Sequence, residues 1–333
     1  MVNPWDIKVD GFVKCKTERQ RLSYLVSYAI LAPSTHNSQP WQFLIGNDCI
    51  ELSPDFSRWL KHSDPSGRQM WLSLGCALEN LLISADFFGY DCGYEIKGEM
   101  ITIKLKRELA GRYDDQHLIF SIPKRVTSRY EQKASIIDEN LKKEILSNAG
   151  NVAIDIIEDK SGMLACAQET SFGTINAFSI KKFRFELSRY LKNNLTKSKI
   201  GMPMFGMGID TLPSFFAPLL LRFINPGKIF AKKASELITN NTGGIVIFST
   251  KNDNMHDWLE VGRVFQRSAL LATKCGYSLS PLAASIEFGD RNSLKNIISK
   301  SDLTPQMFAR LGLAKKSPRH SPRLLLSEIA KYV

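Results

Sequence analysis

The feature of this sequence that most constrains its fold is a repeat of a long apolar segment. Residues 71–90 and 258–277 align without a gap and share Trp, Leu, Gly, Ala, Gly and Tyr, where unrelated segments share about one residue. Small and apolar residues on most faces predict that both segments are packed helices. The repeat predicts two related lobes in one chain. Their pseudo-two-fold interface would correspond to the one that a homodimer of half-size subunits makes. Two buried helices with a similar packing pattern are the alternative interpretation.

The remaining sequence alternates between helix and strand patterns. Apolar spacing predicts helices over 18–32, 71–89, 136–147, 178–191 and 256–276, and strands over 41–45, 50–53, 92–96, 100–106, 152–157, 244–248 and 307–313. A basic, proline-marked connection near 121–130 marks the lobe boundary. Residues 1–120 then form the first lobe and residues 121–333 the second. We predict an α+β fold with two related lobes fused in one chain, an internal pseudo-dimer.

Composition narrows the classes of function. The net charge of +11 is dispersed among acidic residues without an aromatic-basic motif, which favours an anionic cofactor over nucleic acid. The six cysteines are scattered and the five histidines isolated, so we expect no metal site and a reducing cytoplasm. The most apolar stretch, 212–224, is interrupted by Pro213, Pro218 and Arg222, and residues 1–10 lack a signal-peptide pattern. We therefore expect no membrane partner.

Residues 32–41, which read Ala-Pro-Ser-Thr-His-Asn-Ser-Gln-Pro-Trp, connect a predicted helix to a predicted strand. Ser34, Thr35, Asn37 and Gln39 give this connection many hydrogen-bond donors and acceptors, as a polar ligand requires. The same residue types are expected at a helix end followed by a turn. An ordinary connecting loop is therefore the alternative interpretation.

A second polar segment lies at the predicted lobe boundary. Arg125, Thr127 and Arg129 alternate along the chain, so an extended backbone points all three side chains to one side. Two guanidinium groups and a hydroxyl suit a phosphate dianion. The alternative interpretation is a solvated basic linker.

These segments resemble the nitroreductase family of FMN-binding proteins, and most closely its double-lobed Acg-like branch. The resemblance extends over most of the chain and includes Asp64-Pro65 with Arg68, the repeated helices, and residues 310–323, Arg-Leu-Gly-Leu-Ala-Lys-Lys-Ser-Pro-Arg-His-Ser-Pro-Arg. It implies that the 32–41 loop binds flavin through Ser34, Thr35 and Asn37, and Gln39 of the same polar loop is a further candidate. The fusion of two lobes departs from simple nitroreductases and leaves the substrate range open.

The resemblance also implies a phosphate site and a ring site. Four residues are candidates for the FMN phosphate: Arg125, Thr127, Arg129 and the late Arg323. Backbone amides within 278–285, at Ala283 and Ala284, are expected near the reactive flavin nitrogen, where they would stabilise negative charge on the reduced ring. An exposed terminal arginine and a plain loop are the respective alternatives. Because the 32–41 pattern occurs only in the first lobe and the 125–129 pattern only in the second, we expect one complete flavin site per chain.

We therefore predict an FMN-dependent oxidoreductase that passes hydride from NADH or NADPH through FMN to a small-molecule electron acceptor. No side chain stands out as an acid, base or nucleophile, so the sequence assigns no catalytic residue. The alternative is an FMN storage or sequestration protein with little reductase activity, in which the Met- and Phe-rich segment 201–224 covers the flavin as a lid. Ordinary core or interface packing is the other interpretation of that segment. The chain is expected to be a monomer with an internal pseudo-dimer, or a homodimer of it.

Overall fold

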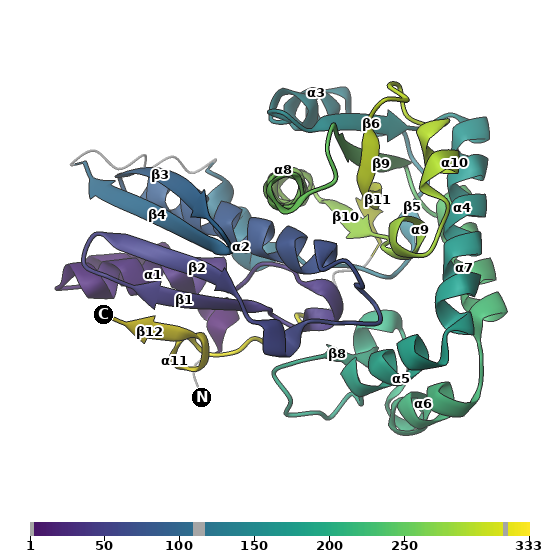
Figure 1. The fold of residues 1–333 in the computed structure, drawn as a ribbon, viewed down its shortest axis with the longest axis horizontal. Helices are drawn as coiled ribbons and strands as arrows, with labels where there is room; N and C mark the ends of the chain where they lie inside the picture. The colour runs from purple at the N-terminus through teal and green to yellow at the C-terminus, as the bar shows by residue number, and fades with distance from the viewer. Residues whose placement is uncertain (1–2, 109–116, 316–318) are drawn as a thin grey trace.

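The computed structural model describes residues 3–108, 117–315 and 319–333 and shows an α+β fold with two main sheets (Figure 1). The helices are α1 (Glu18–Ala29), α2 (Arg68–Phe87), α3 (Glu139–Ser147), α4 (Lys160–Ser179), α5 (Lys181–Tyr190), α6 (Thr211–Phe223), α7 (Gly227–Thr239), α8 (Met255–Lys274), α9 (Ala284–Glu287), α10 (Arg291–Lys295) and α11 (Leu326–Ile329). The strands are β1 (Trp41–Ile45), β2 (Cys49–Pro54), β3 (Tyr90–Lys97), β4 (Met100–Arg107), β5 (Gln132–Lys133), β6 (Ala153–Ile157), β7 (Leu191–Lys192), β8 (Met202–Pro203), β9 (Gly244–Thr250), β10 (Tyr277–Pro281), β11 (Thr304–Ala314) and β12 (Ala330–Tyr332). The predicted α+β class is confirmed.

The two sheets have the same internal order. The first contains β1-β2-β4-β3, with α1 before β1 and α2 between β2 and β3. The second contains β6-β9-β11-β10, with α3 before β6 and α8 between β9 and β10. Every neighbouring pair in these two paths is antiparallel. The long insertion between β6 and β9, which holds α4 to α7, has no counterpart between β1 and β2.

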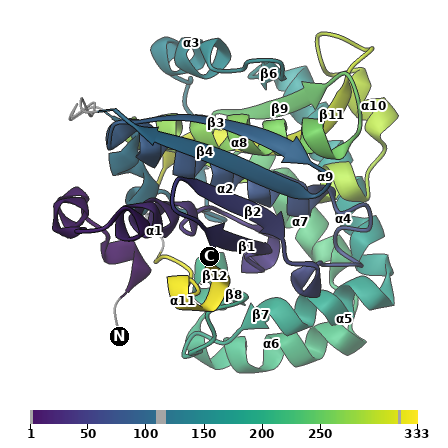
Figure 2. The same ribbon diagram turned by 60° about the vertical axis from the view of Figure 1, so that its left-hand side comes forward.

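The repeated helices α2 and α8 pack against each other between the sheets (Figure 2). Their glycines make a reciprocal contact: a methyl group added to Gly75 would lie 2.1 Å from the carbonyl oxygen of Leu259, and one added to Gly262 would lie 2.2 Å from the carbonyl oxygen of Leu72. In the repeat, Gly75 aligns with Gly262 and Leu72 with Leu259. Each helix therefore contacts the other through the same pair of positions, as in an isologous interface.

Polar side chains one turn further along repeat this reciprocity. Arg267 donates from Nε to Glu79 Oε1 at 2.6 Å, and Gln266 donates from Nε2 to Asn80 Oδ1 at 2.7 Å. Glu79 aligns with Gln266 and Asn80 with Arg267 in the repeat. Glu79, Asn80 and Gln266 are almost completely buried, so these contacts hold the two lobes together away from solvent. The largest apolar cluster also extends across both lobes.

Local sequence explains where the main helices begin. The side chain of Thr17 accepts from the backbone of Gln20, and Gln20 returns the contact, which gives α1 a capping box. The carboxylate of Asp64 accepts from the backbone N–H groups of Gln69 and Met70 at 3.0 and 2.9 Å and so caps the first turn of α2. The repeated helix α8 is capped by Asn254, whose side chain accepts from the backbone N–H of Asp257.

Two sequence predictions differ from the structure. The run 307–313 was expected as the last strand and belongs to β11, but β12 follows it and pairs in parallel with β1, with Ala330 opposite Phe43. The chain thus returns to the first sheet, although the predicted boundary assigns all residues after 120 to the second lobe. The unpaired edge of β1 explains this return, because it offers free backbone groups to a distant segment. Helices α4 and α7 were not predicted; α4 exposes Leu164 and Phe172, which blurs its periodicity.

None of the helices within the described residues is both long enough and apolar enough to cross a membrane.

Candidate functional site

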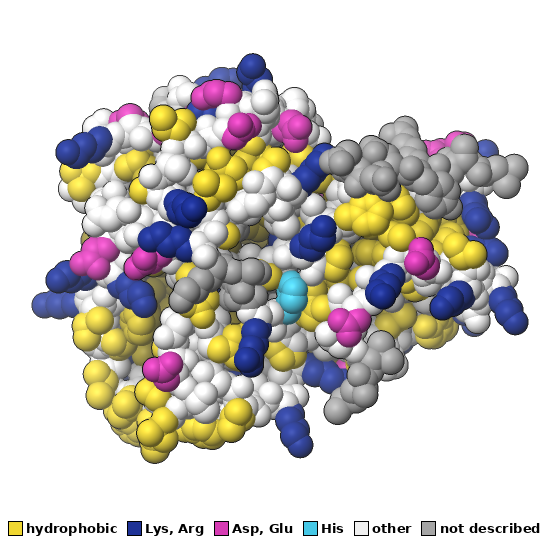
Figure 3. Space-filling view, turned by 180° about the vertical axis from the view of Figure 1, so that it is seen from behind, with side chains coloured by type: hydrophobic (Ala, Val, Ile, Leu, Met, Phe, Trp, Pro, Cys, Tyr) yellow, Lys and Arg dark blue, Asp and Glu magenta, His cyan; other side chains and the backbone are white. Residues whose placement is uncertain are grey.

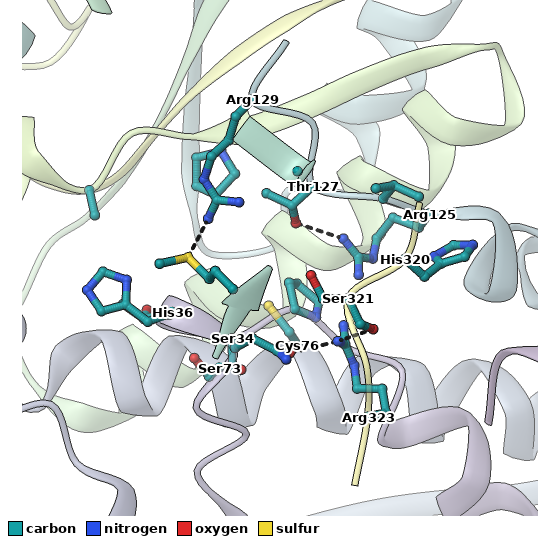
Figure 4. Close-up of a pocket in the computed structure, with 18 of the residues that line it drawn as sticks. Ser34, His36, Ser73, Cys76, Arg125, Thr127, Arg129, His320, Ser321 and Arg323 are labelled. Atoms are coloured by element: carbon teal, nitrogen blue, oxygen red, sulfur yellow. Dashed lines mark hydrogen bonds between the residues drawn. The ribbon is translucent and has the colours of Figure 1, made fainter. Parts of the chain in front are cut away.

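A cavity of about 260 Å³ lies where the two lobes meet. Its wall combines the connection between α1 and β1, the facing sides of α2 and α8, the extended segment before α3, and residues 319–323 near the end of the chain. Figure 4 shows Arg125, His320 and Arg323 at one end of the cavity, with Arg129 and His36 toward the other. Segments far apart in sequence therefore form one polar site.

The connection between α1 and β1 has an unusual backbone. His36, Asn37 and Gln39 have φ angles of 53°, 54° and 51°, in the left-handed region that residues with a side chain rarely occupy. Three such residues within four positions store strain, a condition that persists only where surrounding contacts impose it and that is concentrated at functional sites. Two of those contacts are the bond from Gln39 N to Ser34 Oγ at 2.9 Å and that from Arg58 Nη1 to the Gln39 carbonyl at 2.9 Å.

Asn37 and Gln39 tie this connection to distant parts of the chain. The Asn37 amide donates to the carbonyl oxygens of Gly201 and Pro322, each at 3.0 Å. The fully buried Gln39 side chain donates to the carbonyl of Lys199 at 2.8 Å and accepts from Leu324 N at 2.9 Å. Asn37 lines the cavity but Gln39 does not, so the structure places Gln39 behind the wall as a support.

Two buried guanidinium groups form the most polar end of the cavity. Arg125 and Arg323 are each only 5% exposed. Arg125 donates to Thr127 Oγ1 at 3.1 Å and to the carbonyl of Leu31 at 3.3 Å, while Arg323 donates to Asn37 Oδ1 at 2.7 Å. The Leu31 carbonyl, just beyond the end of α1, lies at the negative end of that helix.

No carboxylate neutralises this pair within the described residues, since neither Arg125 nor Arg323 takes part in an ion pair there. The Nε atoms of both residues and Nδ1 of His320 are buried without a hydrogen-bond partner. Burial lowers the pKa of Arg125 to about 10 and that of Arg323 well below its ordinary value, the latter with a further contribution from Arg125. Buried charges are costly unless they are paired, so this end of the cavity is built for an anion.

Sequence reasoning missed several residues around these arginines. Trp5 stacks on His320 with ring centroids 4.0 Å apart, and the Arg323 guanidinium lies 4.7 Å from the Trp5 ring centroid. Burial, together with Arg125 and Arg323, lowers the pKa of His320 to about 4. Ser321 and Arg319 line the same region. The run Arg-His-Ser-Pro-Arg over 319–323 was the available signal, but only Arg323 was selected from it.

The other end of the cavity contains Arg129 and His36. Arg129 reaches the sulfur of Met202 in β8, with Nη2 and Sδ 3.1 Å apart. His36 Nε2 lies 3.2 Å from Ser63 Oγ. Burial, with a smaller contribution from Arg129, lowers the pKa of His36 to about 3, so this imidazole is neutral near neutral pH. Met202, Pro203 and Gly206 line this side, so the first residues of the predicted lid segment form part of the cavity wall.

Helix α2 contributes the floor, which the sequence analysis did not select. Gln69, Ser73 and Cys76 line the cavity from successive turns of α2. Thr35 Oγ1 donates to Gln69 Oε1 at 2.9 Å, and Gln69 Nε2 donates to Glu287 Oε1 at 2.8 Å. The loop of the first lobe is thereby connected through α2 to α9 of the second.

Arg68 and Glu287 approach to 2.6 Å with almost no exposed side-chain surface. This contact is close in distance but lacks the alignment of a hydrogen bond, since all three guanidinium nitrogens of Arg68 have no directed partner.

The structure brings most of the predicted residues together. Ser34, Thr35, Asn37, Arg125, Thr127, Arg129, Ala283 and Arg323 line the cavity. Ala284 does not; it opens α9, and its carbonyl oxygen would lie 2.2 Å from a methyl group on Gly173 of α4, so the close approach of these helices determines its place. Residues 316–318 of the predicted 310–323 segment lie outside the described residues. Within the described part of the chain, no group of His, Cys, Asp or Glu is arranged for a metal.

No family model matches the chain. The chain is 22% identical over 327 residues to "Putative NAD(P)H nitroreductase Rv3131" of Mycobacterium tuberculosis, covering 92% of this chain and 90% of the relative. It is also 37% identical over 59 residues to "Putative NAD(P)H nitroreductase acg" of the same species, covering 18% of each chain. These matches confirm the predicted resemblance to the nitroreductase-like family and its Acg-like relatives.

Solved structures with similarity include a putative nitroreductase from Anabaena variabilis, with a TM-score of 0.48, 9% identity and coverage of 93% of this chain and 92% of the other. The FMN-dependent nitroreductase NfnB from Mycobacterium smegmatis, solved in complex with NADPH, has a TM-score of 0.39 and 13% identity, covering 63% of this chain and 94% of the other.

Proposed function

We propose that this protein is an FMN-dependent oxidoreductase of the nitroreductase type, which uses NADH or NADPH as donor and a small molecule as electron acceptor. The observation that carries the proposal is the buried pair Arg125 and Arg323, which lacks a carboxylate partner among the described residues and faces a cavity between two lobes. The nitroreductase-type relatives support the same reaction class.

The side chains present fit the phosphate of FMN. A phosphate dianion would be held by Arg125 and Arg323, with Thr127 as a hydroxyl donor, and it would supply the negative charge that these residues lack. His320 has an unpartnered Nδ1 in the same region, and a nearby dianion would raise its pKa toward the ordinary range. Arg129, the fourth residue predicted for the phosphate, lies toward the other end of the cavity beside Met202 and is not part of this group.

The rest of the cavity fits the uncharged parts of FMN. Ser34, Thr35 and Ser73 present hydroxyl groups that would orient a polyol and a ring with many acceptors, and Phe265 of α8 offers an apolar wall. When FMN is bound, the chemistry supplied is two-electron transfer from the nicotinamide donor to the acceptor. The protein's own part is to orient the group and limit its contact with water, and no acid or base is assigned.

The deciding experiment is an absorbance spectrum of the purified protein, reconstituted with FMN and then mixed anaerobically with NADPH or NADH. The proposal predicts a protein-bound flavin spectrum that bleaches within the mixing experiment. Failure to bind FMN after reconstitution contradicts the proposal outright. Stable binding without bleaching by either donor contradicts the reductase and supports storage.

Storage or sequestration of FMN is the second candidate, and one observation favours it. The segment around β8 is attached to the cavity wall by the Asn37 bond to Gly201 and by the contact of Arg129 with Met202. A segment secured at two points would restrict access of a bulky nicotinamide donor. Only the first part of the predicted lid over 201–224 lines the cavity, whereas the apolar side chains of α6 are exposed to solvent. The rate at which NADH or NADPH bleaches the bound flavin distinguishes a protein with restricted donor access from an active reductase.

We also propose that the two lobes arose by internal duplication, with a division near residues 120 and 121. The shared strand order and the reciprocal contacts of α2 and α8 support this origin. An internal pseudo-dimer would act as a monomer or as a homodimer of the fused chain. All six cysteines are free thiols, which agrees with the predicted cytoplasmic location.

A further inference from the structure

Helix α6 (Thr211–Phe223) exposes its more apolar side to solvent. The exposed residues are Leu212, Phe215, Phe216, Leu219, Leu220 and Phe223, spaced so that they form one continuous face. Leu212 and Phe223 are 73% and 78% exposed. The opposite side, which packs on the protein, buries only Ser214 and Leu221. A surface helix normally has the reverse pattern, so the exposed side of α6 is suited to another apolar medium.

Neighbouring elements extend this face into a patch, which we call the α6 patch. It comprises the six exposed residues of α6 together with Ile175, Ile180, Phe185, Ile224, Ile229 and Phe230, all of them exposed. Figures 1 and 2 show α6 at the outer edge of the molecule, below α5, and Figure 3 shows apolar side chains gathered at the lower left of the opposite view. Large exposed apolar patches mark sites of interaction.

Positive charge is concentrated in the same part of the chain. Residues 171–233 contain eleven Lys and Arg residues and two acidic residues, a net charge of +9 out of +11 for the whole chain. The basic residues are Lys181, Lys182, Arg184, Arg189, Lys192, Lys197, Lys199, Arg222, Lys228, Lys232 and Lys233. The charge that appeared dispersed along the sequence is therefore concentrated in the segment that contains α6.

Most of this charge is not neutralised by the protein. Within the described ranges, only Lys199 and Lys232 of the eleven basic residues take part in an ion pair. Of the two acids, Glu186 is occupied by the backbone N–H groups of His62 and Ser63, the latter at 2.7 Å. Asp210 occupies the N-cap position of α6. This part of the chain thus combines large apolar side chains with surplus positive charge. The long side chains of Lys and Arg can lie along an apolar surface while their charged ends stay in water.

We propose that the α6 patch attaches the protein to the surface of an anionic lipid membrane, with α6 lying in the plane of the interface. An amphipathic helix with aromatic and aliphatic residues beside Lys and Arg is the composition that partitions into such an interface. With 13 residues, α6 is about 20 Å long, which is shorter than a membrane span. This proposal differs from the sequence-based expectation of no membrane partner, which considered only spanning segments.

Charge distinguishes this occupant from a second copy of the chain. A symmetric dimer through the α6 patch would bring together two identical surfaces, each with the same surplus of positive charge. Like charges placed across an interface oppose association, whereas anionic head groups neutralise them. Attachment would also place the cavity near the membrane, because Met204–Met207 directly precedes α6 and its Gly206 lines the cavity. The proposal does not depend on the reaction assigned above.

Flotation with vesicles of phosphatidylcholine and phosphatidylglycerol tests the proposal on the full chain. We expect binding to mixed vesicles, much weaker binding to pure phosphatidylcholine, and loss of binding as salt is raised. The double variant Phe216→Gln with Leu220→Gln and the double variant Lys181→Glu with Lys228→Glu should each lower the partition coefficient by about tenfold or more. Circular dichroism checks that both variants remain folded.

Matched controls use the same substitutions elsewhere. Lys14→Glu with Lys16→Glu reverses two exposed charges in the first lobe, and Ile136→Gln replaces an apolar side chain that is 84% exposed. Both controls should bind vesicles within about twofold of the unmodified protein. Absence of binding to anionic vesicles at low salt overturns the proposal. The proposal is also overturned if sedimentation without lipid shows a dimer and the Phe216 and Leu220 double variant dissociates it. The α6 patch would then be an interface with a second copy of the chain.

Discussion

The two lobes share a framework and differ in their connections. Both have four antiparallel strands in the same order, with one helix before the first strand and the repeated helix after the second. In the first lobe, α1 and β1 are joined by the strained residues 30–40; in the second, α3 and β6 are joined by the short stretch 148–152. The common framework forms the interface between the two lobes, which we call the seam. The unequal connections determine which side of the seam has a site.

The same difference applies to the strands beyond the repeated helix. A tight turn joins β3 to β4, whereas β10 and β11 are joined by residues 282–303, which contain α9 and α10 and contribute Ala283 to the cavity. A homodimer would form two equivalent sites at this seam. With unequal connections, a fused chain can have one site, while side-chain packing fills the other half of the seam.

The largest effect expected from this comparison is on the number of flavins that one chain binds. If the connections decide the site, titration with FMN should saturate at one equivalent per chain, because the counterpart of the 32–41 loop is absent from the second lobe. Isothermal titration or fluorescence quenching measures this ratio. Two equivalents of similar affinity would show that both halves of the seam are functional.

The shared framework is tested at the crossing of α2 and α8. Gly262→Ala should lower the free energy of unfolding by about 3 kcal/mol, because a methyl group there overlaps the backbone at Leu72 and the helices must separate. Chemical denaturation measures the change. Gly93→Ala is the matched control, since no atom lies within 4 Å of a methyl group at that position. Equal small effects at both glycines would contradict the reciprocal helix contact.

The contribution of the second lobe is tested at Arg125. Arg125→Met should weaken FMN binding by about 10- to 100-fold, because hydrogen bonds to a charged group contribute roughly 1.5–3 kcal/mol. The same variant should raise the melting temperature of the flavin-free protein, since it removes a buried charge without a carboxylate partner. The exposed neighbour is the control, and Lys124→Met should change neither quantity. A destabilised apoprotein would mean that Arg125 is a structural residue.

The strained connection of the first lobe predicts a pH-dependent effect through His36. Its pKa is lowered to about 3 in the folded protein, below its ordinary value of 6.5. Below pH 6.5 the unfolded chain therefore binds a proton that the folded chain does not, and stability falls as pH decreases from 6.5 toward 3. This loss should approach about 1.4 kcal/mol per pH unit for one proton.

Denaturation curves at several pH values measure this slope, and His36→Gln should reduce it by one proton. His256→Gln, at an exposed histidine, is the matched control. An unchanged slope in the His36 variant would show that the imidazole is accessible to water and that the connection is looser than the structure indicates.

Much of the fold was predictable because its signals are local. Strand β1 occupies the predicted residues 41–45, and the hairpin of β3 and β4 turns at Gly98, which has the expected positive φ of 58°. The repeated helices were found with ends within a few residues of those predicted. The parallel pairing of β12 with β1 was not predictable from these patterns, since it joins residues nearly 290 positions apart.

The candidate site was predicted only in part. Arg125 and Arg323 were selected separately, but nothing in the sequence indicated that both would approach the carbonyl of Leu31. Gln39 was placed on the ligand side and lies behind the wall, because its carboxamide can bond to either side and only packing selects one. Ser73 and Cys76 escaped notice because they are ordinary residues within an apolar helix. The assigned cofactor contacts remain predictions.

The sequence by itself determined the repeated helices, the polar loop, the basic segment and the surplus of positive charge, because each is encoded in residues that lie close together along the chain. Only the tertiary structure decided where these parts meet. Packing of α2 against α8 creates the seam, and the return of the C-terminal segment places Arg323 beside Arg125. The fold also leaves the apolar side of α6 exposed to solvent, because the side that a helix buries depends on which elements pack against it.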